Sequence, residues 1–411
     1  MALYGFGNNW AGQLGFENNE TFEPNRLFIG SFEHVRTSRI HGGMQHSLFL
    51  EDLSGTVFTA GQPRDGALGL GSQITTLTVP FFSQIVDVVE RDSDQEAEVR
   101  QVSIRTARII DVCSGWNHIC FIREGTKTAV FCSGKNDQGQ LGNTAVSERT
   151  LTPIGVIGDT EFASKKFVKI TCGADHTVAT AADGTVWAWG SGEEGSLGNG
   201  KTSASQKPVK VTLPASVVPQ DIACGFRFCA LRTPRGVLWG WGSNEFSQLS
   251  RPSSMAKLPT PEIIYEQGVQ QIAAGGYHIL AVVDGKLWSC GSGTLGQTGH
   301  PLPHAPTIKK SWTQDKLAPV ASMHRVNIQS ISAGIKHSLA LDTCGNVYAF
   351  GSDAFGQLGV GYLGLNADFR SLNPQSIEKV RSWNLDVVGV SAVGYHSFIT
   401  VKERKRVLPG L

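Results

Sequence analysis

An internal repeat constrains this chain more than any other feature of its sequence. One half of the repeat reads Gly-x-x-His before an apolar segment, as in Gly334–His337. The other half is an aromatic or β-branched segment that runs through a polar turn into Gly-Gln-Leu-Gly, as in Val347–Gly359. Each half occurs seven times along the 411 residues. Self-similarity of this kind indicates one supersecondary unit that is used repeatedly and is stabilised by its neighbours.

The copies of the first half differ in quality but keep their order. Two are degenerate, with Phe228 in the His place after Gly225 and Val393 in the Gly place before His396. The complete copies are Gly43 to His46, Gly115 to His118, Gly173 to His176, Gly275 to His278 and Gly334 to His337. The second half begins near Tyr4, Val57, Val130, Val186, Val237, Leu287 and Val347.

The local sequence within each repeat is typical of β-strands. Val186–Trp189 is rich in β-branched and aromatic residues and is bounded by glycine clusters. Asp183-Gly184 joins this segment to the preceding apolar one, and Asp-Gly is a strong hairpin signal. The 48 glycines supply the positive-φ positions that many tight turns require. Each repeat therefore predicts a small antiparallel sheet of about four strands.

The order of the half-repeats predicts how these sheets assemble. One such sheet has two apolar faces, and radial stacking in a closed ring buries both of them and protects the strand edges. The chain opens with a lone second half at residues 4–15 and ends with a lone first half at 391–401. We predict that these two pair, so that residues 1–401 form a single all-β domain, a closed seven-bladed β-propeller. Residues 402–411 are predicted to be a short basic tail.

Three connections are longer than the repeat requires, at residues 87–107, 300–326 and 360–385. The mixed-charge run Glu90–Glu98 predicts that the first is an exposed, mobile loop. Long loops on a rigid ring often carry function. Tolerated sequence drift is the alternative explanation, and both stay open at this stage.

Composition and charge weigh against several classes of partner and compartment. The net charge is +1, which gives no long-range field to gather nucleic acid or an anionic membrane. No apolar stretch reaches the roughly 18 residues of a membrane span, and the first residues lack the pattern of a leader. We expect a soluble protein of the cytoplasm, the nucleus or both, with no nucleic-acid or membrane partner.

The residues that could carry chemistry are arranged as structural residues. The eight cysteines form no Cys-x-x-Cys pair, and most lie in apolar segments where a cysteine acts as a small hydrophobe. Their even number is also compatible with disulfides. A ring spreads the repeat histidines apart, so we expect them to bond backbone groups between strands. These structural histidines are His46, His118, His176, His278, His337 and His396.

Motifs of small-substrate enzymes do not occur in the sequence. There is no Gly-x-Ser-x-Gly nucleophile elbow and no phosphate-binding loop that ends in Gly-Lys-Ser or Gly-Lys-Thr. We therefore predict no catalytic residues, no cofactor and no metal site.

The turn in the second half of the repeat resembles that of the regulator-of-chromosome-condensation family. The closest copies to that hallmark are Gly7–Gly15 and Gly134–Gly142, and the resemblance covers residues 3 to about 401. WD and kelch propellers are alternatives on blade count, but their hallmark dipeptides do not recur here. In layout the chain is similar to propeller-only members such as the yeast alpha-tubulin suppressor type. That resemblance implies an adaptor or regulator in the cytoplasm or nucleus. Because closure of the ring leaves no strand edge for a partner to cover, we expect a monomeric propeller.

Two function hypotheses follow from this resemblance. The first is a non-catalytic protein–protein interaction scaffold. The second is guanine-nucleotide exchange on a Ran-type small GTPase, the activity of the founding family member. The acidic and aromatic turn residues that could contact a partner are Asp137, Glu193, Glu194, Glu245, Phe246, Asp353 and Phe355.

The sequence also weighs against two activities of the family. No basic tail precedes the repeats and no counterpart of the GTPase-contacting wedge loop aligns, so no catalytic residues are carried over for exchange. Light sensing is a third hypothesis, because the plant ultraviolet-B photoreceptor shares the fold and uses clustered tryptophans from a Gly-Trp-Arg-His-Thr motif. Here only Trp116 occupies that position.

Overall fold

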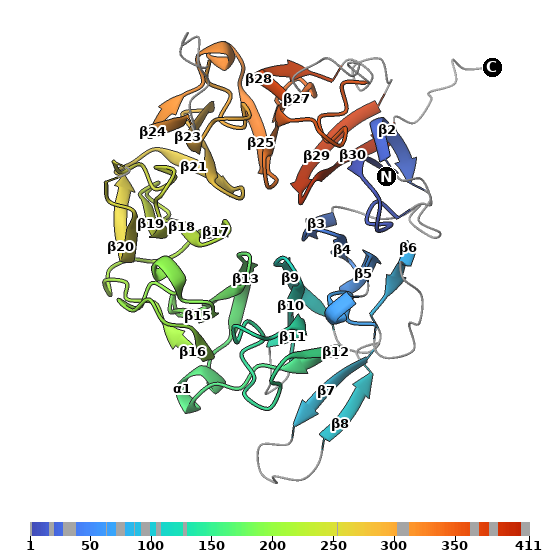
Figure 1. Cartoon of the computed structure of the whole chain (residues 1–411), viewed down its shortest axis with the longest axis vertical. Coiled ribbons are helices and arrows are strands. Elements are labelled where there is room, and N and C mark those ends of the chain that lie inside the picture. Colours follow the sequence, from blue (N-terminus) through green and yellow to red (C-terminus); the bar gives the residue numbers. More distant parts are fainter. Residues whose placement is uncertain are drawn as a thin grey trace, which may run out of the picture.

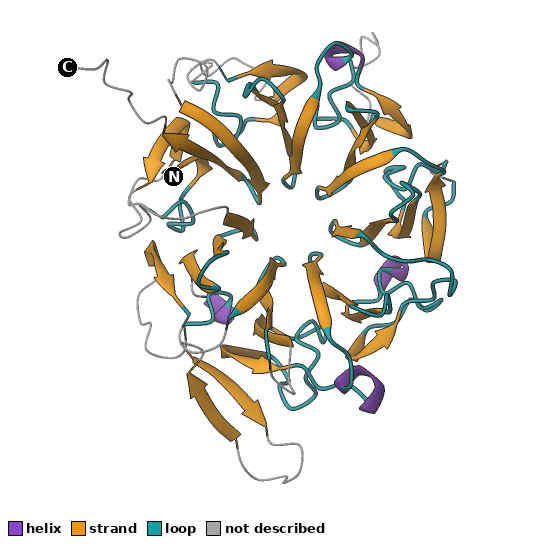
Figure 2. Ribbon diagram, turned by 180° about the vertical axis from the view of Figure 1, so that it is seen from behind, coloured by secondary structure: helices purple, strands orange, loops and turns teal. Residues whose placement is uncertain are grey.

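Seven β-sheets are arranged radially around a central axis in the computed structural model of the chain (Figures 1 and 2). The model describes residues 2–15, 20–27, 38–62, 64–70, 79–85, 87–91, 99–103, 108–125, 130–252, 254–301, 312–361, 370–377 and 385–403. The predicted all-β, seven-bladed propeller is confirmed.

The blades follow one another around the ring in chain order. Blade 1 consists of β3 (Ser38–Gly42), β4 (His46–Glu51), β5 (Thr56–Gly61) and β6 (Val79–Gln84). Blade 2 contains β9 (Ile109–Ser114), β10 (His118–Arg123), β11 (Val130–Lys135) and β12 (Arg149–Gly155). Blade 3 consists of β13 (Phe167–Cys172), β14 (His176–Ala181), β15 (Val186–Gly190) and β16 (Ser205–Lys210). Blade 4 consists of β17 (Asp221–Cys224), β18 (Phe228–Arg232), β19 (Leu238–Ser243) and β20 (Lys257–Tyr265).

The remaining blades keep the same order of strands from the axis outward. Blade 5 consists of β21 (Val269–Ala274), β22 (His278–Val283), β23 (Lys286–Ser292) and β24 (Thr313–Pro319). Blade 6 consists of β25 (Ile328–Ala333), β26 (His337–Asp342), β27 (Val347–Ser352) and β28 (Arg370–Ser376). Blade 7 consists of β29 (Leu385–Val393), β30 (His396–Glu403), β1 (Ala2–Asn8) and β2 (Glu20–Leu27).

Blade 7 closes the ring from both ends of the sequence. Its sheet order is β29, β30, β1 and β2, so β1 lies between β30 and β2. The antiparallel register pairs Ala2 with Val401 and Gly7 with His396. The predicted closure by complementary half-repeats is confirmed.

A hairpin stands in place of the loop predicted over residues 87–107. Strands β7 (Asp87–Arg91) and β8 (Val99–Ser103) pair with each other, and β7 also pairs in parallel with β12 at Val89 and Ile154. This hairpin extends blade 2 to six strands and projects outward from the ring (Figure 1). The valines on both sides of the charged run favour strands, which an interpretation based on charge alone overlooked. Residues 92–98 and 104–107 lie outside the described part of the chain.

The other two predicted loops also contain parts of the blades. Residues 300–326 include β24 and the 3-10 turn Ala321–Met323, and residues 360–385 include β28. The predicted basic tail overlaps the end of β30, which runs to Glu403. Residues 302–311, 362–369, 378–384 and 404–411 lie outside the described residues.

Helix is scarce in the described residues. The α-helix α1 spans Thr160–Ala163, and two further 3-10 turns cover Arg64–Gly66 and Glu193–Gly195. Among the described helices, none has the length and the apolar character that crossing a membrane requires.

The hydrophobic core lies between blades. Between blades 2 and 3, for example, Val130 and Leu141 pack in one cluster with Ile170 and Trp189. Trp189 is fully buried, and its indole Nε1 donates a hydrogen bond to the carbonyl oxygen of Gln140, at 3.0 Å. Each blade therefore depends on both neighbours for burial of its faces.

Candidate interaction face and the contacts that position it

The six repeat histidines lie between blades, and each reaches a side chain of the next blade. Their Nε2 atoms are 2.6–3.2 Å from the partner atom, and the contacts run around the ring in one direction. The pairs are His46–Ser114, His118–Thr177, His176–Cys229, His278–Ser338, His337–Ser397 and His396–Ser47. The sequence analysis expected these histidines to bond backbone groups, but their hydrogen-bond partners are side chains. The reason is that each imidazole points across the interface to the next blade and not along its own sheet.

A hydroxyl group relays this contact back to the blade of the histidine. Ser338 Oγ lies 2.8 Å from His278 Nε2 and donates to the carbonyl oxygen of Gln297, at 2.7 Å. Because the hydroxyl has one proton to give, the histidine Nε2 must donate to it, which places a proton on Nε2. His337 and Ser397 repeat the arrangement, with the carbonyl of Gln357 as the acceptor.

Burial keeps these rings uncharged. The pKa values of five repeat histidines are lowered from 6.5 to about 3, chiefly by removal from water. These residues are His46, His176, His278, His337 and His396. A group that stays neutral and bonds the neighbouring blade fits a role in packing and not in proton transfer.

The degenerate fourth copy follows the same logic with apolar groups. In five of the six pairs the partner directly follows the repeat His, or Phe228, of the next blade, and Ile279 takes that place opposite Phe228. His46 differs, because Ile119 takes that place in the next blade and His46 bonds Ser114 instead. Phe228 and Ile279 are fully buried in one apolar cluster. The phenyl ring thus fills the place of the imidazole and packs in the same apolar cluster as Ile279.

Seven glycines form a second closed ring at the ends of the inner strands. A Cβ built on Gly173 would lie 2.0 Å from His176 Cε1 and 2.6 Å from the carbonyl oxygen of Gly225 in the next blade. The same contact recurs from Gly43 to Gly115, Gly173, Gly225, Gly275, Gly334 and Gly394, and from Gly394 back to Gly43. In the seventh copy the close contact is made by Gly394, which follows the expected Val393 position. The motif therefore needs glycine, because a side chain at this position would collide with the aromatic ring of its own repeat or with the carbonyl oxygen of the next blade.

These contacts fix one end of the propeller, which we call the turn face. In an antiparallel blade, the turn after the first strand and the turn after the third strand lie at the same end. Ring contacts confirm this: Phe246, after β19, lies 4.9 Å from Tyr277, after β21, and Phe355, after β27, lies 5.3 Å from Tyr395, after β29. The Gly-x-x-His turns and the Gly-Gln-Leu-Gly turns therefore form one surface.

Six of the seven predicted interaction residues are accessible on the turn face. Asp137, Glu193 and Glu245 are exposed, and Glu194, Phe246 and Phe355 are half-buried. Two of the acidic groups are paired: Lys135 lies 2.6 Å from Asp137, and Arg227 lies 3.3 Å from Glu193.

Asp353 is the exception among these residues. It is buried, and its Oδ1 accepts a hydrogen bond from the backbone N–H of Leu358, at 2.8 Å. Asn136 makes the equivalent bond to Leu141 in blade 2. The expectation of an exposed residue is wrong here, because Asp353 occupies the turn-closing position that asparagine fills elsewhere. Burial raises its pKa to about 7, although the bond from Leu358 opposes that shift.

Aromatic residues that the sequence analysis did not select complete the turn face. Trp116 and Phe226 meet edge to face at 4.8 Å, and Phe226 meets Tyr277 at the same distance. A second group forms around Phe355, which lies 5.8 Å from Trp10. Trp10 is 64% exposed, the most open large hydrophobic side chain among the described residues. Several of these rings occupy the x positions of Gly-x-x-His, so aromatic residues at those positions could have predicted this part of the turn face from the sequence.

A cavity of about 420 Å³ runs along the axis between the inner strands. Trp116 and Phe226 line it from the turn face, and Arg39 and Asp111 also contribute to its wall. Arg39 bonds the buried carboxylate of Asp111 at 2.6 Å, and the same carboxylate accepts from the backbone N–H of Ile170. The charges at this wall are therefore already paired within the propeller.

The cysteines are more closely associated than the sequence indicated. Cys120 pairs with Cys132 and Cys224 with Cys229 in disulfides between adjacent strands of one blade. The remaining cysteines are free: Cys113, Cys172 and Cys290 are buried, whereas Cys344 is exposed.

Comparison with known proteins identifies relatives of different size. Human E3 ubiquitin-protein ligase HERC2 is 30% identical over 82% of this chain, but the match spans 6% of HERC2. The Ultraviolet-B receptor UVR8 of Arabidopsis thaliana is 29% identical over 64% of this chain and 58% of its own length. The Regulator of chromosome condensation of Xenopus laevis is 24% identical over 96% of this chain and 88% of its own.

Solved structures share the complete ring. Prp20p from Saccharomyces cerevisiae has a TM-score of 0.80 at 20% identity, covering 98% of this chain and 92% of that one. Human WBSCR16 has a TM-score of 0.77 at 19% identity, covering 98% of this chain and 100% of that one. A family model described as RCC1-like domain matches residues 82–409. With its seven blades and this match over most of its length, the chain belongs to the RCC1-like domain family.

Proposed function

We propose that this chain is a non-catalytic protein–protein interaction scaffold, or regulatory adaptor, whose partner docks on the turn face. The observation that carries the proposal is the gathering of half-exposed rings and carboxylates on that one surface. Aromatic side chains supply large contact area at low entropic cost, and surrounding charges select the partner.

Charge complementarity indicates the chemistry of the partner. Asp137, Asp175, Glu193, Glu194 and Glu245 lie in the turns of this face, against the basic residues Lys135, Arg227 and Lys336. A partner segment with apolar anchors and a basic flank would match this excess of carboxylates.

Replacing Trp10 with serine is expected to weaken partner capture at least tenfold, because this ring is the most exposed aromatic group of the turn face. Leu53→Ser is the matched control, since Leu53 is 60% exposed but lies in the β4–β5 turn at the opposite end. Tagged full-length variants would be compared by affinity purification and mass spectrometry. Equal recovery of the same partner with Trp10→Ser and wild type would contradict docking on the turn face.

Guanine-nucleotide exchange on a Ran-type small GTPase is the second candidate. It is favoured by the similarity to the Xenopus laevis Regulator of chromosome condensation over nearly the whole chain. Prp20p, which shares the fold, is described with its binding properties to Gsp1p and histones. Purification with and without EDTA separates the candidates, because an exchange factor holds the nucleotide-free GTPase most tightly. Release of GDP from Ran by catalytic amounts of this protein would establish exchange, whereas a stable complex unaffected by EDTA would establish the scaffold.

A further inference from the structure

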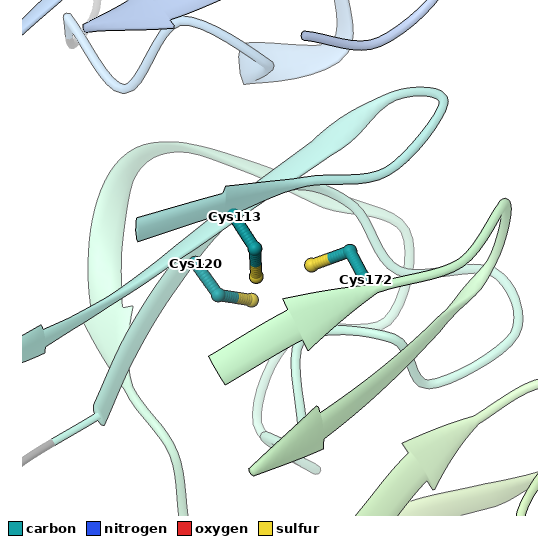
Figure 3. A group of neighbouring side chains, drawn as sticks. All are labelled: Cys113, Cys120 and Cys172. Carbon is teal, nitrogen blue, oxygen red and sulfur yellow. The ribbon is translucent and has the colours of Figure 1, made fainter. Parts of the chain in front are cut away.

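Three cysteines of two different blades face one another across the interface between blades 2 and 3. Their Sγ atoms all lie within 4.8 Å of one another. Cys113 on β9 and Cys120 on β10 are register partners, so their side chains leave the sheet on the same side. Cys172 on β13 approaches from blade 3, and Figure 3 shows the three sulfur atoms turned toward one another.

The three sulfur atoms are buried but can be reached from the central cavity. All three residues are buried, and the hydroxyl of Thr177 lies 3.7 Å from Cys120 Sγ and 3.9 Å from Cys172 Sγ. His118 Nε2 lies 3.1 Å from that same hydroxyl. Cys113 and Cys172 also line the central cavity, which offers a route from the axis of the ring to the sulfur atoms.

We propose that Cys113, Cys120 and Cys172 form a binding site for a thiophilic d10 metal ion, Zn²⁺ or Cu⁺, that joins blade 2 to blade 3. Thiolates are the ligands that both ions favour. A metal–sulfur bond of about 2.3 Å places the ligand atoms roughly 3.8 Å apart in a tetrahedral site. The observed sulfur separations reach that value with small side-chain rotations. The ion replaces the weak contacts of three thiols with bonds that span the interface.

Formation of the site begins with reduction, because Cys120 is bonded to Cys132. Two equivalents of a cellular thiol reduce this disulfide: the S–S bond breaks, two S–H groups form, and the thiols leave as their own disulfide. The ion then displaces the protons of Cys113, Cys120 and Cys172, which pass to water, and no electron is transferred in that step. The Cys120–Cys132 disulfide and the metal-bound triad therefore exclude each other, because both use the sulfur atom of Cys120.

The two ions differ in the number of ligands that they need. Structural Zn²⁺ is almost always four-coordinate. The imidazole of His118, which bonds the Thr177 hydroxyl beside Cys120 and Cys172, is the candidate fourth ligand. Cu⁺ is satisfied by three thiolates. The contribution of His118 therefore distinguishes the ions.

A second group at the next interface serves as an internal comparison. His176 Nε2 lies 3.2 Å from Cys229 Sγ, and Cys224 Sγ completes a set within 4.8 Å. Its two sulfur atoms, those of Cys224 and Cys229, are bonded to each other in a disulfide within blade 4. Blade 3 contributes only one nitrogen atom to this second group. We therefore assign the metal site to Cys113, Cys120 and Cys172, and use the second group as a control for metal binding elsewhere in the ring.

The test uses the full-length protein, reduced and stripped of metal under anaerobic conditions. Zn²⁺ and Cu⁺ are each titrated in competition with a chromophoric chelator, and one equivalent of at least one ion is expected to bind. Cys113→Ser and Cys172→Ser are expected to weaken that binding at least 100-fold. Cys290→Ser removes a buried thiol elsewhere in the ring and is expected to leave it unchanged. His118→Gln weakens the binding of Zn²⁺ but not that of Cu⁺.

Several outcomes would overturn the proposal. Equal affinity of wild type and Cys172→Ser for both ions would do so, as would loss of the ion from Cys224→Ser with retention in Cys172→Ser. Because a variant can fail to fold, X-ray absorption of the metal-loaded wild type provides an independent readout. A first shell of at least three sulfur atoms supports the site, and a shell of oxygen and nitrogen atoms alone refutes it.

Discussion

Acidification from pH 7 to pH 5 is expected to lower the free energy of unfolding by about 2 kcal/mol for each of five buried histidines. Their pKa values are about 3 in the folded ring and 6.5 when exposed. Below pH 6.5 the unfolded chain therefore binds protons that the folded chain does not, and stability falls as the pH falls toward 3. The combined effect of five groups rivals the whole stability of many domains. Asp353, whose pKa is about 7 in the folded ring, acts in the opposite direction and offsets about one of these groups. Urea unfolding at a series of pH values measures the net effect.

The chain itself offers the variant that isolates one of these steps. His278→Phe copies Phe228, and the hydroxyl of Ser338 keeps its acceptor, the carbonyl of Gln297. This variant is expected to take up one proton fewer on unfolding, so its loss at pH 5 is smaller by about 2 kcal/mol. His324→Gln changes an exposed ring and serves as the control. An unchanged pH profile for His278→Phe would show that burial of the ring does not control the acid response.

Replacement of Gly173 by alanine is expected to cost more than about 3 kcal/mol of stability, or to prevent folding. The added methyl group would lie 2.6 Å from the carbonyl oxygen of Gly225, a backbone atom of the next blade. It would also strike the ring of His176, which is itself buried in the interface. Neither neighbour can withdraw without opening the contact between blades 3 and 4. Thermal and urea unfolding monitored by circular dichroism give the measurement.

Gly389→Ala provides the matched comparison for this effect. Gly389 also lies in a β-strand, but the nearest atom to its added Cβ is that of Thr400, at 3.8 Å. We expect a change within about 0.5 kcal/mol, because the methyl group enters ordinary van der Waals contact. Similar losses for Gly173→Ala and Gly389→Ala would mean that chain flexibility, and not the close contact between blades, explains the glycines.

The fold was predictable because the same strand pattern occurs seven times in the sequence. The two lone half-repeats at the ends also complete one blade only by pairing with each other. The β7–β8 hairpin was missed since it occurs once, in a segment whose charge conceals two short valine-containing strands. The structural reason for Gly-x-x-His was likewise beyond the sequence. A contact between Gly173 and the carbonyl of Gly225 depends on the approach of two blades, and no spacing along the chain encodes it.

The candidate surface and the thiol cluster show the same limit in different ways. Turn residues such as Glu245 and Phe246 could be selected from their position after a strand. Asp353 could not be separated from them, since burial depends on the closure of its own turn. Cys113 and Cys172 are far apart in sequence and lack metal-ligand spacing, and they meet only because strand register and blade stacking align their sulfur atoms.

The place of β1 in blade 7 also governs how a growing polypeptide acquires this structure on the ribosome. Within the ring, β1 is synthesised before the other described strands, yet its partner β30 is the last of them to be made. Until then β1 keeps an open edge, and blades 1 and 6 each lack a neighbour on one side. Translation that stops before β30 leaves strand edges and apolar faces uncovered, and such products are suited to aggregation and to recognition by chaperones and proteases. Completion of the ring therefore covers these edges and faces only in a chain that has been synthesised as far as β30.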